Sequence, residues 1–170
     1  MNQSPDLVNE IIWEGKPIRF ELYLSSDFSG ISGASQVYAF VLDNQNRLLL
    51  VSPEDKKWNL PGGTIESGET YLETLKREVY EEAAIVIDEK TAKPFFYQKV
   101  LDKNKKNEWV LGTIQIRFVC RMTKQDKFVL DPGGNTKNQI FVPISELSQY
   151  LLWGGTTEFI KKNILNFLPE

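Results

Sequence analysis

Glu78, Glu81 and Glu82 stand at positions i, i+3 and i+4 of a segment that follows shortly after a pair of glycines. If that segment is helical, the three carboxylates share one face, because residues three and four apart are neighbours on a helix surface. Carboxylates this close raise one another's pKa unless a cation neutralises them. Oxygen ligands favour a hard divalent ion such as Mg²⁺ or Mn²⁺. The spacing therefore predicts a metal site, and substrate phosphates completing that site would make it one for phosphate chemistry.

The residues around the glutamates predict a helix over residues 70–83 that would position them. Thr70 followed by Glu73 is the signature of a capping box. Apolar residues recur at helical intervals and predict a buried stripe at Leu72, Leu75, Val79 and Ala83. The carboxylates lie to one side of this stripe, so the helix can pack on a sheet while its acidic face lines a cleft. Glu81 and Glu82 alone would more often be a solvated acidic surface.

A longer pattern decides between these interpretations. In order and spacing, the positions that match G-x5-E-x7-R-E-U-x-E-E-x-G-U, where U is a bulky aliphatic residue, are Gly63, Glu69, Arg77, Glu78, Val79, Glu81, Glu82 and Ile85. The stretch resembles the Nudix box, and both the Pro61-Gly62-Gly63 lead-in and residues 65–70 resemble its MutT-like branch. It covers 23 of the 170 residues, and so long a motif in fixed register is specific. One position departs: Ala84 replaces the last glycine of the box, where a left-handed helix end would cost alanine about 1 kcal/mol.

The resemblance implies a fold and a set of site residues. The fold is α/β, the Nudix fold, with a mixed β-sheet sandwiched between helices; we expect residues 1–170 to form one domain, with 1–33 as an N-terminal extension containing short strands. In the family the box glutamates bind Mg²⁺ or Mn²⁺, which assigns the metal to Glu78, Glu81 and Glu82 and to the carbonyl of Gly63. The family's arginine bonds the first glutamate of the box, which here pairs Arg77 with Glu69 and ties loop to helix.

Three features of the site stay open on sequence alone. The carboxylate that takes a proton is not assigned, and relatives often use a further acid from outside the box, for which the candidates are Glu108, Asp126, Asp131 and Glu146. Trp58, just before Leu60-Pro61-Gly62-Gly63, is the aromatic residue best placed by sequence to line the mouth of the site and stack on a nucleobase. Core packing is the more common role for the other aromatic residues.

Composition narrows the chemistry. The chain has no histidine and one cysteine, Cys120, which excludes His-dependent nucleophilic catalysis and His- or Cys-ligated zinc. The groups that remain for general acid–base catalysis near neutral pH are a carboxylate, Lys, Tyr or a metal-bound water. The net charge of −3 gives no field that attracts nucleic acid or membrane. With no signal peptide and no long apolar run, we expect a cytoplasmic protein.

The remaining pattern predicts strands with a few helices. We expect residues 1–9 to be a mobile polar tail, and strands at 11–24, 37–43, 47–52, 85–87, 94–101, 109–122, 127–130 and 140–142. Short helices are expected at 145–152 and 156–167. Apolar residues of the N-terminal strands suggest a homodimer interface at Ile11, Ile12, Trp13, Phe20 and Leu22.

The expected function is metal-dependent hydrolysis of a diphosphate linkage in a nucleoside diphosphate bound to another moiety. The MutT-like lead-in favours a nucleoside triphosphate pyrophosphohydrolase, whereas the N-terminal strands favour an ADP-ribose or nucleotide-sugar pyrophosphatase. An alternative of another class is a regulatory module that binds a nucleotide without cleaving it, against which the complete glutamate set argues. A Nudix-fold isomerase is disfavoured because known relatives of that kind use histidines.

Overall fold

The computed structural model describes residues 3–53, 57–128 and 136–168. Within these ranges the strands are β1 (Leu7–Trp13), β2 (Lys16–Leu24), β3 (Ala34–Leu42), β4 (Arg47–Ser52), β5 (Gly62–Thr64), β6 (Ile85–Lys103), β7 (Trp109–Gln125) and β8 (Asn138–Pro143). The helices are α1 (Tyr71–Ala83) and α2 (Gly155–Asn163), with 3₁₀ turns η1 (Ile144–Gln149) and η2 (Ile164–Phe167).

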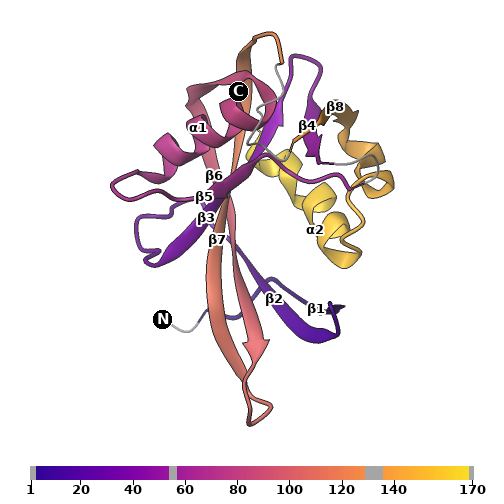
Figure 1. Cartoon of the computed structure of the whole chain (residues 1–170). Helices are drawn as coiled ribbons and strands as arrows, with labels where there is room; N and C mark the ends of the chain where they lie inside the picture. The colour runs from indigo at the N-terminus through magenta and orange to yellow at the C-terminus, as the bar shows by residue number, and fades with distance from the viewer. Residues whose placement is uncertain (1–2, 54–56, 129–135, 169–170) are drawn as a thin grey trace.

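The described strands form one mixed sheet. Its order is β1-β2-β6-β7-β3-β4-β8, and β5 pairs with β3 off this path. β3 and β7 run parallel, whereas the other pairs are antiparallel. The two long strands β6 and β7 run the length of the molecule and carry the β1–β2 hairpin at one end (Figure 1). The predicted α/β class is confirmed.

Helices cover both faces of the sheet. On β3, Val37, Ala39 and Val41 face α1 and join a core with its buried stripe, while Phe40 and Leu42 face the opposite way, into the core that includes residues of α2. This alternation is the period of two that a strand buried on both faces requires. Figure 1 shows α1 and α2 on opposite sides of the strands.

α1 forms where the sequence predicts it. Thr70 is the N-cap, and its side chain accepts from the N–H of Glu73 while the Glu73 carboxylate accepts from the N–H of Thr70, which completes the predicted capping box. Leu75, Val79 and Ala83 are buried and Leu72 is half-buried. The helix ends at Ala84, whose φ of 51° and ψ of 37° are left-handed, so alanine occupies the conformation that a glycine would adopt without strain.

The sequence predictions are wrong at the N-terminus. Residues 1–9 were expected to be a tail, but β1 begins at Leu7 and pairs along β2. Asn9 donates side-chain hydrogen bonds to the carbonyl of Trp153 and the hydroxyl of Thr156, at 3.4 and 3.2 Å, so side-chain contacts far along the sequence order this strand.

The position of β1 and β2 in the structure removes one residue from the predicted dimer surface. Leu22 is fully buried in the core beneath α2, whereas Ile12 and Trp13 are 71% and 63% exposed. Leu22 therefore cannot contribute to an interface, and dimerisation stays a prediction that rests on the exposed residues of β1.

Other elements differ in extent from the prediction. The separate strands expected at 85–87 and 94–101 are one strand, β6, whose pairing with β7 is irregular between Asp88 and Lys93. The helix expected at 145–152 is the shorter η1, and the one expected at 156–167 is divided into α2 and η2. β5 was not predicted at all. The strand expected at 127–130 lies partly outside the described residues, and its described part, 127–128, is not in a strand.

Candidate metal and phosphate site

The site is built where the short strand β5 meets the acidic face of α1. Each residue of β5 contacts a different side chain of the helix. The N–H of Gly62 donates to Oε2 of Glu82 at 2.9 Å, and the Cα of Gly63 lies directly against the Glu78 carboxylate. The carbonyl of Thr64 accepts a hydrogen bond from Nη2 of Arg77 at 3.0 Å. Two of the predicted metal-binding glutamates are thereby brought to the backbone of the Gly62-Gly63 pair.

Glycine is required at both positions, for different reasons. Gly62 has a φ of +149°, and an added Cβ would lie 2.2 Å from the Val37 carbonyl oxygen of β3. That obstacle is backbone and cannot move easily. At Gly63 the added Cβ would instead lie 2.5 Å from Oε2 of Glu78. The pair therefore lets β5 pack tightly on β3 and leaves room for the Glu78 carboxylate.

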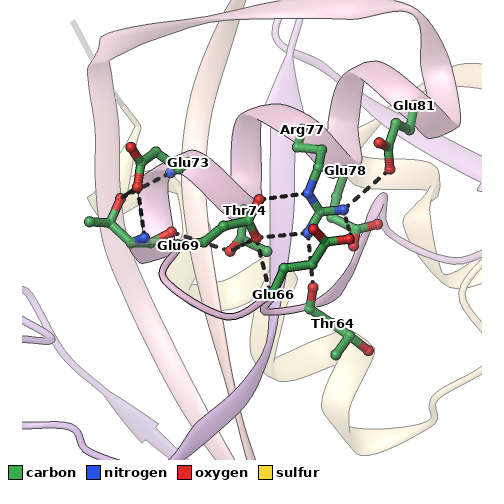
Figure 2. A network of polar contacts seen from close by, with 9 residues as sticks. Thr64, Glu66, Glu69, Glu73, Thr74, Arg77, Glu78 and Glu81 are labelled. Carbon is green, nitrogen blue, oxygen red and sulfur yellow. Dashed lines mark hydrogen bonds and ion pairs between the residues drawn. The ribbon is translucent and has the colours of Figure 1, made fainter.

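Arg77 organises the carboxylates around it, as Figure 2 shows. Its Nε and Nη2 donate to the two oxygens of Glu69, at 2.7 and 2.8 Å. Its Nη1 donates to Glu78 at 2.9 Å and to Glu81 at 3.2 Å. The predicted Arg77–Glu69 pair is thus present in the bidentate geometry that makes such pairs strong and directional, and it ties the loop before α1 to the helix.

Glu69 is held as a charged acceptor. Besides Arg77, the hydroxyl of Thr74 donates to it at 2.8 Å and the N–H of Glu66 at 3.1 Å. The Arg77 guanidinium, with these donors, lowers the pKa of Glu69 to about 2. Hydrogen bonds to the ionised form have this effect. The geometry gives Glu69 a loop-fixing position, turned toward Arg77.

The pKa of Glu82 is raised, whereas that of Glu69 is lowered. Burial is the main cause and raises the pKa of Glu82 to about 7. The hydrogen bond from the Gly62 N–H lowers this pKa in part, and the charge of Glu78 raises it by a smaller amount. The hydroxyl of Thr136, just before β8, also donates to it at 3.4 Å. A buried carboxylate with a raised pKa beside a second carboxylate is a group that a cation would ionise.

The donor set fits a hard divalent ion, although the side chains do not converge fully as they stand. Among the described residues, no three acidic side chains lie close enough together to hold an ion. Glu78 and Glu81 bond Arg77, whereas Glu82 bonds Gly62. The Glu81 side chain is 55% exposed and can rotate toward the other two. A divalent ion would then have carboxylate oxygens beside the backbone of Gly63.

The other predicted residues lie in different places. Trp58 is half-buried and packs edge-on to Tyr150, with 6.4 Å between ring centroids, against the core beneath α2. Of the acids outside the box, Glu108 accepts from Asn104 in the β6–β7 turn, Asp126 pairs with Lys124, and Glu146 is exposed on η1. Asp131 lies outside the described residues.

Sequence reasoning missed two residues next to Glu82. One is Thr136, which reaches the site from a distant part of the chain. The other is Tyr38 of β3, which lies near Glu78 and Glu82. Burial is the main cause that raises the pKa of Tyr38, and the charges of these two glutamates raise it further. Tyr38 also pairs in register with Gly62. Its position directly before the continuous buried run 39–42 of β3 gave a weak signal.

The chain is similar to known proteins in sequence and in fold. The sequence matches the NUDIX domain family over residues 34–162. No curated protein sequence matches it. The Bacillus subtilis pyrophosphohydrolase BsRppH has a similar structure, with a TM-score of 0.68 and 20% identity over 93% of this chain and 96% of that one.

Two further structures are similar over about three quarters of the chain. The MutT protein of Bacillus halodurans gives a TM-score of 0.51 at 24% identity, covering 76% of this chain and 80% of that one. An Ap4A hydrolase of C. elegans gives 0.52 at 13%, covering 77% and 96%. At these identities the likeness shows the fold.

The curled mixed sheet, the α1–β5 junction and the matched domain together define the class, and the chain belongs to the Nudix family. It is accordingly an enzyme of the Nudix pyrophosphohydrolase type, as the motif predicts. In the part of the chain that the structure describes, no helix is long and apolar enough to span a membrane.

Proposed function

We propose that this protein hydrolyses a diphosphate linkage in a nucleoside diphosphate-X substrate with the help of Mg²⁺ or Mn²⁺, and that its substrate is a nucleoside triphosphate cleaved to the monophosphate and pyrophosphate. The observation that carries the proposal is the junction of β5 and α1, where Glu78 and Glu82 meet the backbone of Gly62 and Gly63. The whole chain, residues 1–170, would act as one domain.

Glu78, Glu81 and Glu82, with the Gly63 carbonyl, would hold the divalent ions, which many Nudix proteins use. Bound there, such ions supply charge neutralisation at the phosphates and a lowered pKa for water. Arg77 keeps Glu78 and Glu69 in place. In the reaction, water attacks one phosphorus of the linkage and the P–O bond to the other phosphate breaks. Because the sequence holds no histidine, a carboxylate takes the proton of the water, either one of this set or an acid from a loop outside the box.

A second candidate is an ADP-ribose or nucleotide-sugar pyrophosphatase. The observation in its favour is the β1–β2 hairpin before the matched domain, since relatives of that kind carry an N-terminal β extension. Both candidates use the same carboxylates and differ in the group that lies beyond the scissile linkage. A nucleotide-binding module without activity would need none of the three glutamates, and the sequence has all three.

Product release from a substrate panel tests the proposal. The panel holds the standard and oxidised nucleoside triphosphates, ADP-ribose, nucleotide sugars, dinucleoside polyphosphates and NADH, each with Mg²⁺ and with Mn²⁺. Glu81→Gln and Glu82→Gln are measured beside the wild type, and Glu10→Gln on exposed β1 is the matched control.

We expect turnover of one substrate class that falls at least about 100-fold in the Glu82 variant, since it removes a charged ligand, and persists in the Glu10 variant. Turnover of ADP-ribose alone would select the second candidate. Unchanged turnover in both box variants would show that the metal site lies elsewhere.

A further inference from the structure

Arg117 is a buried cation on the same side of the sheet as Tyr38. It lies in the middle of β7, in register with Tyr38 of β3 and Phe96 of β6, and is 6% exposed. Its guanidinium carbon lies 5.1 Å from the centroids of both aromatic rings. Burial lowers the pKa of Arg117 to about 10, so the side chain is still charged at neutral pH.

Among the described residues, one nitrogen of this guanidinium has a hydrogen-bond acceptor. Nη2 donates to Oε1 of Gln115 at 2.9 Å. Gln115 is itself fixed, because it donates to Gln36 at 2.5 Å and accepts from Gln98 at 3.2 Å across the neighbouring strands. Nε and Nη1 of Arg117 are buried and have no acceptor within the described residues.

Packing alone does not account for this arrangement. The two rings offset part of the charge through cation–π contacts. Buried N–H groups without acceptors nevertheless cost free energy, and more so when the group is charged. A polar row of three glutamines holds the guanidinium in this position instead of releasing it toward solvent. Such unsatisfied groups in a native structure need an explanation, and a bound ligand that accepts from them is one.

The position of Arg117 relative to the carboxylates indicates what that partner is. Tyr38 separates the two: it lies beside Arg117 on one side and pairs with Gly62, the donor to Glu82, on the other. A substrate whose diphosphate lies at Glu78 and Glu82 would reach Arg117 past the half-buried Tyr38. A positive charge that contacts no carboxylate in the described part of the chain is complementary to an anionic oxygen, and guanidinium binds phosphate particularly well.

We propose that Arg117 is a substrate-binding residue whose Nε–H and Nη1–H groups take a phosphate oxygen of the substrate when the Tyr38 ring rotates aside. The inference rests on the proposed function, because it takes the diphosphate to lie at the box carboxylates. It assigns to β7 the recognition of a phosphate group, and to the glutamine row the positioning of the arginine.

Binding of inorganic pyrophosphate in Mg²⁺ buffer, measured by calorimetry, tests this directly. The variants are Arg117→Met, which keeps the length and apolar stem, and Arg117→Lys, which keeps the charge. Arg121→Met is the control, since Arg121 lies on the same strand and bonds the Asp43 carbonyl and Asn46 at the opposite end from the site. Adenosine serves as an uncharged probe, and the melting temperature of each ligand-free variant is recorded.

We expect the Kd for pyrophosphate to rise at least 10-fold in Arg117→Met, to recover in part in Arg117→Lys, and to stay unchanged in Arg121→Met. The ligand-free melting temperature of Arg117→Met should equal or exceed that of the wild type, because an unsatisfied buried charge is removed. A purely structural arginine gives the opposite pair of results, a lower melting temperature with an unchanged Kd, and would overturn the proposal. If Arg117→Met weakens the binding of adenosine but not that of pyrophosphate, the proposal is also overturned.

The two proposals fail separately. If the wild type hydrolyses a substrate, and Glu82→Gln does not, while Arg117→Met keeps its pyrophosphate affinity, only the role of Arg117 is wrong. If the wild type neither binds pyrophosphate nor hydrolyses any substrate, both are wrong.

Discussion

The backbone N–H of Gly62 donates a hydrogen bond of 2.9 Å to Oε2 of Glu82, so a residue of β5 fixes a largely buried carboxylate of α1. This bond favours the charged form of Glu82, but burial has the larger effect and raises its pKa to about 7. The balance makes Glu82 the side chain whose protonation is expected to respond most to pH and to metal.

Stability of the metal-free protein should fall as the pH rises through this range. Because the pKa of Glu82 is raised above its ordinary value of 4.5, the folded state binds more protons than the unfolded state between pH 4.5 and 7, and the stabilisation is lost as pH increases. Relative to Glu82→Gln, we expect the wild type to lose about 1–3 kcal/mol between pH 4.5 and 7.5. Urea unfolding with a chelator present measures this, and parallel pH profiles of the two proteins would contradict it.

Replacing Arg77 by lysine should weaken both the fold and the activity. Lysine keeps the charge but cannot bond both oxygens of Glu69 and also reach the Thr64 carbonyl. We expect a loss of about 2 kcal/mol in the free energy of unfolding, which is typical of hydrogen bonds to charged groups, and a lower kcat/KM. Arg47→Lys is the control, because Arg47 pairs with the single acid Asp43 away from the site. Equal losses in the two variants would show that the position of Arg77 has no special role.

Alanine at the two glycines of β5 should separate folding from function. Gly62→Ala places a methyl group against the backbone of Val37, and we expect at least about 2 kcal/mol of destabilisation from strain and overpacking. Gly63→Ala meets only the end of the Glu78 side chain, so it should fold with nearly the wild-type melting temperature and lose activity as that carboxylate is displaced.

Gly30→Ala, where an added Cβ meets open space, is the control for both glycine variants. Melting temperatures and kcat/KM of the three proteins give the comparison. Full activity in Gly63→Ala would show that the place of Glu78 over the glycine is not needed.

Glycine at Ala84 should stabilise the protein. Ala84 adopts a left-handed conformation at the end of α1, which costs alanine about 1 kcal/mol and glycine almost nothing. Allowing for the greater freedom of glycine in the unfolded chain, we expect Ala84→Gly to gain about 0.5 kcal/mol with unchanged kcat/KM. Ala83→Gly, in the buried last turn of the helix, should instead lose stability. A destabilised Ala84→Gly would mean that the methyl group makes contacts that outweigh the strain.

Local patterns in the sequence predicted the parts of the site that form within α1. The capping box at Thr70, the buried stripe and the acidic face depend on spacing within one helix, and the structure has all three. The Arg77–Glu69 pair followed from the family motif. Each of these features depends on residues no more than about a dozen positions apart.

The parts that could not be predicted depend on pairing between distant segments. Gly62-Gly63-Thr64 has low strand propensity and becomes β5 only because β3 pairs with it. Arg117 looked like one polar residue in an alternating strand, and its burial follows from Tyr38 and Phe96 on the two neighbouring strands. Asp88 to Lys93 interrupts a pattern that the backbone continues through an irregularity.

The β1–β2 hairpin has a protective consequence for the domain that follows it. β2 pairs with β6 from Ile18–Asp102 to Leu24–Phe96, and the family match begins only at residue 34. A fragment trimmed to the matched domain would therefore bare a row of unpaired N–H and C=O groups along β6 and lose the fully buried Leu22. Open edges of this kind recruit other strands. The hairpin places the 7-residue β1 at the sheet edge in place of the 19-residue β6, so we expect the trimmed domain to self-associate more than the whole chain.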